Sequence, residues 1–220
     1  MFVLVACEES QRVCKAFRDK GHIAFSCDII DASGDFPEWH IKQDVLPLLN
    51  GFCSFTTCDG TQHHIPQRWD MIIAFPPCIY LTAAGACRLY PQKGVLDPDR
   101  YELGKQAAEF FMAILNADCD KIVIENPTPM KVFNLPKYNQ VIEPFMFGHP
   151  YKKRTCLWLK GVKPLEPTEI ITEGIMNWVN GGSKDRNGQP RNIKTTNFRD
   201  SKTRSKTFTG IALAMAEQWG

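Results

Sequence analysis

The sequence has no apolar run that approaches the roughly 18 residues of a membrane-spanning helix. Its first residues, MFVLVACEES, also lack the basic leader and the small-residue cleavage site of a secretory signal. We therefore expect a soluble, cytoplasmic protein with no membrane partner.

A regular cysteine framework is absent as well. The nine cysteines are odd in number and scattered, unlike those of small secreted proteins, so most should be reduced and buried. The segment CSFTTCDGTQHH holds Cys53, Cys58, His63 and His64, but this spacing is unusual for zinc, and adjacent histidines rarely bind one ion. We expect no metal site. Instead, we expect a loop that packs near the turn at residues 76–78 and in which His63 or His64 contacts a substrate phosphate.

There is little net charge, since 26 Lys and Arg residues nearly balance 24 Asp and Glu residues. The charge is unevenly distributed, however, because residues 183–206 hold two aspartates and eight basic residues: Lys184, Arg186, Arg191, Lys194, Arg199, Lys202, Arg204 and Lys206. Two interpretations stay open. The segment is either a phosphate-binding surface or a solvated loop that is merely basic.

Apolar patterning predicts alternating strands and helices in a chain of 220 residues, which is long enough to bury one sizeable core. The expected strands are 2–6, 22–29, 40–45, 69–75 and 121–126, and the expected helices are 10–21, 100–117 and 208–219. Residues 141–148 and 154–161 should form an antiparallel hairpin. The fold class is therefore α/β, with a mostly parallel sheet, helices on both faces and a small irregular basic segment.

Polar residues gather at the carboxyl ends of these strands, where ligands bind in parallel sheets. Asp28, Asp44 and Glu125 each end a predicted strand, and Cys78 follows another in AFPPC. The two prolines fix two φ angles and so orient the thiol. Taken singly, the acidic residues are common turn or helix caps and the cysteine is inert; their convergence predicts a catalytic crevice.

These residues resemble the DNA cytosine-C5 methyltransferases. AFPPC (74–78) is similar to the Pro-Cys of their catalytic loop, ENP (125–127) to their Glu-Asn-Val element, and KKRTCLWLKG (152–161) to their arginine-bearing strand. The order along the chain agrees, and residues 201–220 have the place of their closing helix. The resemblance implies a Rossmann-like methyltransferase domain over residues 1–160 and 201–220, with residues 161–200 as a short target-recognition segment.

The same resemblance implies the chemistry of the crevice. Cys78 would add to C6 of cytosine, which turns the ring into an enamine-like nucleophile at C5. Glu125 would act as a protonated carboxyl at N3 and the exocyclic amine, and Arg154 would hold the O2 edge of the base. Lys152 or Lys153 would instead serve phosphate. The partner would be duplex DNA, with the target base flipped out of the stack.

The implied cofactor is S-adenosyl-L-methionine. Asp28 would accept hydrogen bonds from the ribose and Asp44 from the adenine amine, while Pro76 and the turn from Cys7 through Glu8 to Ser10 would complete the site. The family's glycine-rich turn is replaced here by ACEESQ. Glu8 or Glu9 is therefore predicted either to receive the cofactor's ammonium group or to open the following helix, where the dipole favours acids.

A recognition segment as short as residues 161–200 can read few base pairs. The favoured function is therefore methylation of cytosine C5 in DNA at very short or loosely defined sites, as would suit a compact phage or prophage genome. A free pyrimidine nucleotide as substrate, a partner protein that supplies recognition, and an inactive relative that only binds nucleic acid stay open. The sequence does not indicate an oligomeric state.

Overall fold

The computed structural model describes residues 1–178 and 201–220. Most of the predicted basic segment therefore lies outside the described residues. The helices are α1 (Arg12–Asp19), α2 (Ala86–Leu89), α3 (Pro98–Leu115), α4 (Ser201–Ser205) and α5 (Thr209–Trp219). Across the described ranges, no helix combines the length and the apolar character that a bilayer crossing requires.

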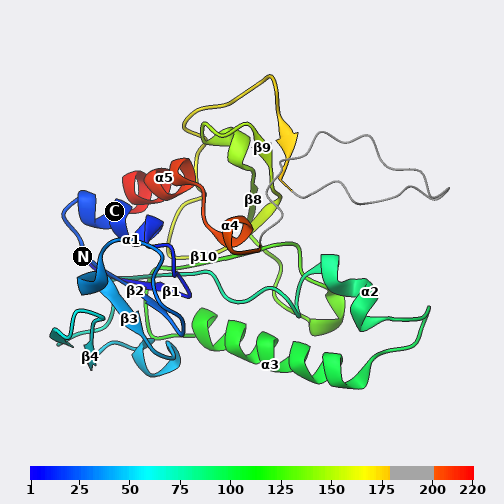
Figure 1. The fold of residues 1–220 in the computed structure, drawn as a ribbon, viewed down its shortest axis with the longest axis horizontal. Coiled ribbons are helices and arrows are strands. Elements are labelled where there is room, and N and C mark those ends of the chain that lie inside the picture. Colours follow the sequence, from blue (N-terminus) through cyan, green and yellow to red (C-terminus); the bar gives the residue numbers. More distant parts are fainter. Residues whose placement is uncertain (179–200) are drawn as a thin grey trace.

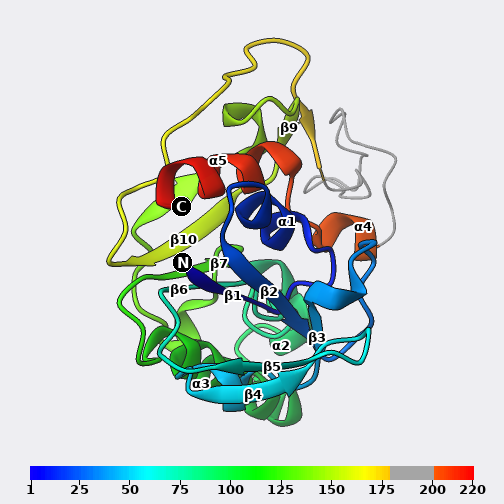
Figure 2. The ribbon, with the colours of Figure 1, turned by 90° about the vertical axis from the view of Figure 1, so that its left-hand side faces the viewer.

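A seven-stranded sheet forms the centre of the molecule (Figures 1 and 2). Its strands, in spatial order, are β3 (His40–Lys42), β2 (Ile23–Asp28), β1 (Phe2–Ala6), β6 (Met71–Ala74), β7 (Ile122–Asn126), β10 (Thr155–Lys160) and β8 (Gln140–Ile142). The first five are parallel to one another, and β10 is antiparallel to both of its neighbours. The prediction of an α/β protein with a mostly parallel sheet is confirmed at this level.

Helices cover both faces of the sheet because alternate side chains of a strand point to opposite faces. Val3 and Val5 of β1 pack in the apolar cluster that holds α1 and α5, whereas Leu4 packs in the cluster that holds Phe111 of α3. Figure 1 shows α1 and α5 on one side of the sheet and α3 on the other. This double burial explains why β1 and β6 are continuously apolar.

Two segments differ from the sequence prediction. Residues 53–65 form an antiparallel hairpin of β4 (Cys53–Thr56) and β5 (Gln62–Ile65) rather than a loop, because Phe55 and Ile65 are buried in the core. The hairpin predicted from 141–148 and 154–161 does form between β8 and β10, but its first strand ends at Ile142. A separate small sheet then pairs β9 (Tyr151–Lys152) with β11 (Met176–Asn177).

The strand order changes direction at β1, whose neighbours are β2 on one side and β6 on the other. The helix α1 leads from β1 to β2, whereas the chain reaches β6 only after β3 and the β4–β5 hairpin. Such a reversal opens a crevice beyond the carboxyl ends of the two strands, and open α/β sheets bind their ligands there. The fold thus places Cys7 and Phe75, which follow β1 and β6, at the crevice.

Candidate active site

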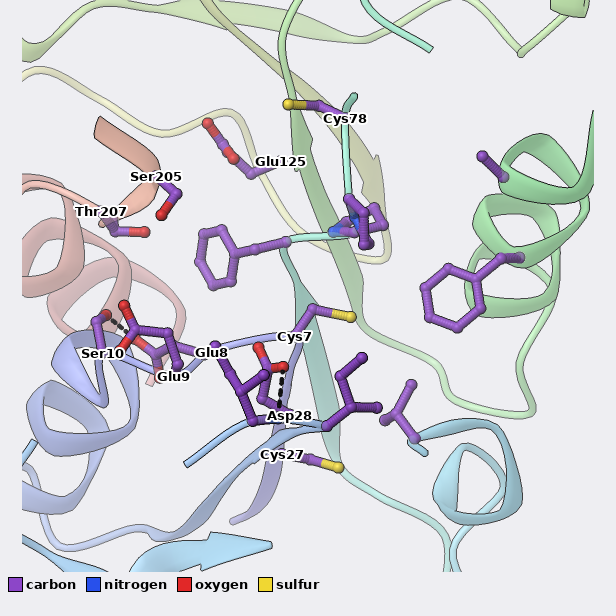
Figure 3. Close-up of a pocket in the computed structure, with 18 of the residues that line it drawn as sticks. Cys7, Glu8, Glu9, Ser10, Cys27, Asp28, Cys78, Glu125, Ser205 and Thr207 are labelled. Carbon is purple, nitrogen blue, oxygen red and sulfur yellow. Dashed lines mark hydrogen bonds between the residues drawn. The ribbon is translucent and has the colours of Figure 1, made fainter. Parts of the chain in front are cut away.

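A cavity of about 620 Å³ opens at this point of the fold (Figure 3). It falls in the size range of small-molecule sites. Eight of the nine predicted site residues line it: Cys7, Glu8, Ser10, Asp28, Asp44, Pro76, Cys78 and Glu125. Strand ends that are far apart in the sequence therefore contribute to one cavity.

The turn that carries Cys78 is tied to the end of β7. The side-chain amide of Asn126 donates to the carbonyl of Pro76 at 3.0 Å, and the carbonyl of Cys78 accepts from the backbone of Thr82 at 2.9 Å. Because Glu125 precedes Asn126 in β7, the same contacts fix the thiol relative to the carboxyl group. Figure 3 shows Cys78 and Glu125 together at one end of the cavity.

The electrostatic surroundings of these two groups oppose their ionisation. Burial raises the pKa of the Cys78 thiol, and the nearby Glu125 carboxylate raises it further. Burial also raises the pKa of Glu125. The Lys153 ammonium acts in the other direction and lowers the pKa of both groups. Burial at this end therefore favours the protonated forms of both groups, and Lys153 is a charge that favours the thiolate and the carboxylate.

Lys153 lines the cavity, and Arg154, the ninth predicted residue, does not. The Arg154 guanidinium donates to the hydroxyl groups of Thr128 at 3.2 Å and Tyr138 at 3.1 Å, and its side chain is exposed. Sequence reasoning considered Lys153 only for a phosphate. The resemblance pointed to the arginine, and no local signal shows which of two adjacent basic side chains faces the cavity.

In the turn after β1, residues other than glycine adopt a strained, left-handed backbone conformation. Cys7 and Gln11 both have a φ of +57°, a left-handed conformation that costs about 1–2 kcal/mol for a residue with a side chain. Gln11 is locked there by bonds to the backbone of Phe36, which it contacts at 2.8 and 3.2 Å. Missing glycines therefore do not prevent this turn from bending beside the cavity.

Glu8 opens helix α1, as one of the two sequence interpretations proposed. Its carboxylate accepts the backbone N–H groups of Val13 at 2.7 Å and Cys14 at 3.1 Å. Burial nevertheless raises the pKa of Glu8 to about 7, against the opposing effect of these hydrogen bonds. The adjacent Glu9 also lines the cavity.

Asp28 is the last residue of β2, whereas Asp44 follows β3 by two residues because that strand ends at Lys42 rather than at the predicted residue 45. Asp28 is half-buried and accepts from the N–H of Ile30 at 3.3 Å, and burial raises its pKa. Asp44 is exposed and accepts from Leu46 at 3.1 Å. In each aspartate, this hydrogen bond is made by Oδ1 and not by Oδ2.

The chain end contributes a further wall that residue patterns did not indicate in detail. Arg204 and Ser205, at the end of α4, and Lys206 and Thr207, which lead to α5, line the cavity. Arg12 holds this stretch by donating to the carbonyl of Thr207 at 2.7 Å. On the opposite side, Leu103, Ala107 and Phe110 of α3 supply an apolar wall.

The predicted phosphate contacts of His63 and His64 have no counterpart at the cavity, since neither residue lines it. His63 hydrogen-bonds Thr57 at 3.1 Å and packs against Phe25 and Phe55, while His64 hydrogen-bonds Ser54 at 3.0 Å. Among the described residues, no three His, Cys, Asp or Glu side chains are grouped so that they could hold a metal ion.

Comparisons with protein-family models and with curated proteins found no match to this sequence.

Proposed function

We propose that this protein is an S-adenosyl-L-methionine-dependent methyltransferase that modifies C5 of cytosine in DNA through Cys78. The observation that carries the proposal is the meeting of Cys78, Glu125 and Lys153 at one end of a cavity that also contains Asp28 and Asp44. A nucleophile, a proton donor and a cation thus share one cavity with carboxylates at strand ends, where α/β proteins hold nucleotides.

The residues around the cavity fit the proposed cofactor. Asp28 keeps an oxygen for ribose hydroxyls, the apolar wall of α3 suits an adenine ring, and the Glu9 carboxylate has no hydrogen-bond donor among the described residues. Bound S-adenosyl-L-methionine would supply an electrophilic methyl group on a sulfonium. The Rossmann-like methyltransferase fold that the sequence resemblance implies would place Cys7, Asp44 and Pro76 beside it.

Cys78 would act as the nucleophile. The thiolate sulfur forms a bond to C6 of the cytosine, and the electron pair of the C5–C6 double bond becomes available at C5. Glu125, whose pKa is raised, donates its proton to N3 and neutralises the charge that develops there. After C5 is alkylated, the C5 proton leaves to solvent, the Cys78 thiolate departs from C6 and the N3 proton returns to Glu125, which restores both the aromatic ring and the acid.

Lys153 would take the part that the resemblance assigned to Arg154. Its ammonium group would stabilise the Cys78 thiolate and hydrogen-bond the O2 oxygen of the base. Arg154, which lies outside the cavity, would be left for the DNA backbone. The basic stretch 183–206 is proposed to add phosphate contacts, although most of it lies outside the described residues.

The test is methyl transfer from radiolabelled S-adenosyl-L-methionine to mixed-sequence duplex DNA, single-stranded DNA and dCMP. We expect label in duplex DNA with the wild type and with Cys87→Ser, a control at an exposed cysteine, and none with Cys78→Ser. A second assay uses DNA that contains 5-fluorocytosine, in which the strong C–F bond keeps the Cys78 adduct from breaking down, so mass spectrometry detects the adduct.

Label in dCMP alone would identify a free nucleotide as the substrate. Transfer that persists in Cys78→Ser would contradict the covalent mechanism. Absence of both transfer and cofactor binding would overturn the enzymatic proposal and leave a nucleic-acid-binding relative.

A further inference from the structure

The carboxylate of Glu9 is buried without a hydrogen-bond donor. Its side chain is only 11% exposed, and neither oxygen accepts a hydrogen bond from any described residue. Glu9 nevertheless lines the cavity, and Figure 3 shows it on the side where Ser10, Ser205 and Thr207 lie. A buried carboxylate that lacks donors is unfavourable unless a ligand supplies them.

The neighbouring Glu8 cannot play this part. Both of its oxygens already accept backbone N–H groups at the start of α1. The two adjacent acidic residues of ACEESQ therefore differ in function. Glu8 accepts hydrogen bonds at the start of α1, whereas the Glu9 carboxylate accepts none from the described residues. The difference is not visible in the sequence, where either residue is an equal choice.

Two basic residues that precede α5 line the same cavity as Glu9, and one of them lies beside it. The Lys206 ammonium is 4.0 Å from a Glu9 oxygen and donates to the Ser33 hydroxyl at 2.7 Å. The Nε atom of Arg204 is also buried with no acceptor among the described residues, and both basic side chains line the cavity. The cavity lining thus holds the Lys206–Glu9 ion pair together with an acceptor and a donor that have no hydrogen-bond partner among the described residues.

We propose that Glu9, together with Lys206 and Arg204, binds the amino-acid end of the cofactor. Glu9 accepts the α-ammonium group, and the two basic residues bind the α-carboxylate. An α-amino acid carries its ammonium and carboxylate groups on one carbon, which matches an acidic and a basic side chain that lie 4.0 Å apart. This inference rests on the proposed function, and it identifies the ligand class as a nucleoside that carries a zwitterionic amino acid.

Two thioether ligands separate this contact from adenosine binding. S-adenosylhomocysteine carries the amino acid, whereas 5′-methylthioadenosine has the same nucleoside and thioether without it. Titration calorimetry of the full chain with each ligand measures the two affinities. We expect Glu9→Gln to weaken S-adenosylhomocysteine about 10- to 100-fold, as for hydrogen bonds to charged groups, and 5′-methylthioadenosine less than about 3-fold.

Lys206→Gln should weaken the same ligand selectively, and it carries the test if Glu9→Gln does not fold. Glu217→Gln, at an exposed acidic residue of α5 that does not line the cavity, is the matched control and should leave both affinities unchanged. Equal losses for both ligands in Glu9→Gln and Lys206→Gln, or no loss in either variant, would overturn the inference alone. If the wild type binds neither ligand, the proposed function falls and this inference falls with it.

Discussion

Lys153→Met removes the cation that faces Cys78, and its effect on the thiol can be measured without any substrate. Lys153 lowers the pKa of Cys78, while burial and Glu125 raise it. An opposite charge at close range shifts a pKa by about 1–3 units, and the half-buried position of Lys153 leaves some screening by solvent. We therefore expect the variant to raise the pKa of Cys78 above that of the wild type.

The assay is the rate of Cys78 alkylation by iodoacetamide as a function of pH, followed by mass spectrometry of the peptide that contains Cys78. This readout separates Cys78 from the exposed Cys58 and Cys87. Only the thiolate reacts, so the higher pKa should lower the rate of alkylation measured below it, by up to about 10-fold. Lys153→Arg keeps the charge and should stay close to the wild type.

Arg154→Met is the matched control at the adjacent residue. Its guanidinium is bonded to Thr128 and Tyr138 and lies outside the cavity, so its loss should change the Cys78 rate less than about 2-fold. An unchanged rate in Lys153→Met, combined with a slower rate in Arg154→Met, would refute the assignment of the catalytic cation to Lys153.

Three further predictions concern the framework of the site. Asn126→Ala leaves the Pro76 carbonyl without its donor and should lower the free energy of unfolding by about 1–3 kcal/mol, measured by urea denaturation. For Glu8, the native pKa of about 7 exceeds the ordinary value of 4.5, so the native state binds more protons between these pH values. The contribution of Glu8 to the free energy of unfolding is thus largest below about pH 4.5, and it falls by about 3 kcal/mol as the pH rises to about 7. Glu8→Gln should remove this pH dependence from denaturation curves recorded across that range. Gly210→Ala would bring a Cβ into the Phe147 carbonyl oxygen and should lower stability by about 1–3 kcal/mol, seen as a lower Tm.

Each of these has an outcome that contradicts it. A urea midpoint for Asn126→Ala equal to that of the wild type would mean that the hydrogen bond to Pro76 contributes nothing. An unchanged pH slope in Glu8→Gln would assign the dependence to other groups. The control for Gly210→Ala is Leu213→Ala, at a residue of α5 that is 58% exposed, which should stay within about 0.5 kcal/mol of the wild type; equal losses in both would remove the steric explanation.

Much of the sheet could be predicted because strands buried on both faces leave a continuous apolar signal. The first strand, 2–6, matches β1 residue for residue, and 121–126 exceeds β7 by one residue. Strand direction follows from the strand–helix alternation. The sequence therefore places Asp28, Asp44, Cys78 and Glu125 at the carboxyl-end edge of the sheet, and all four line the cavity.

The sequence by itself determined which strand ends meet at the cavity; only the tertiary structure decided which side chains line it. Lys153 and Arg154 are adjacent and equally basic, and contacts with Thr128 and Tyr138, which are distant in sequence, direct Arg154 outside the cavity. Glu8 is likewise committed to α1, whereas Glu9 keeps its carboxylate unsatisfied among the described residues. Periodicity records burial along one element, but the partners of a polar side chain come from other elements, and packing alone selects them.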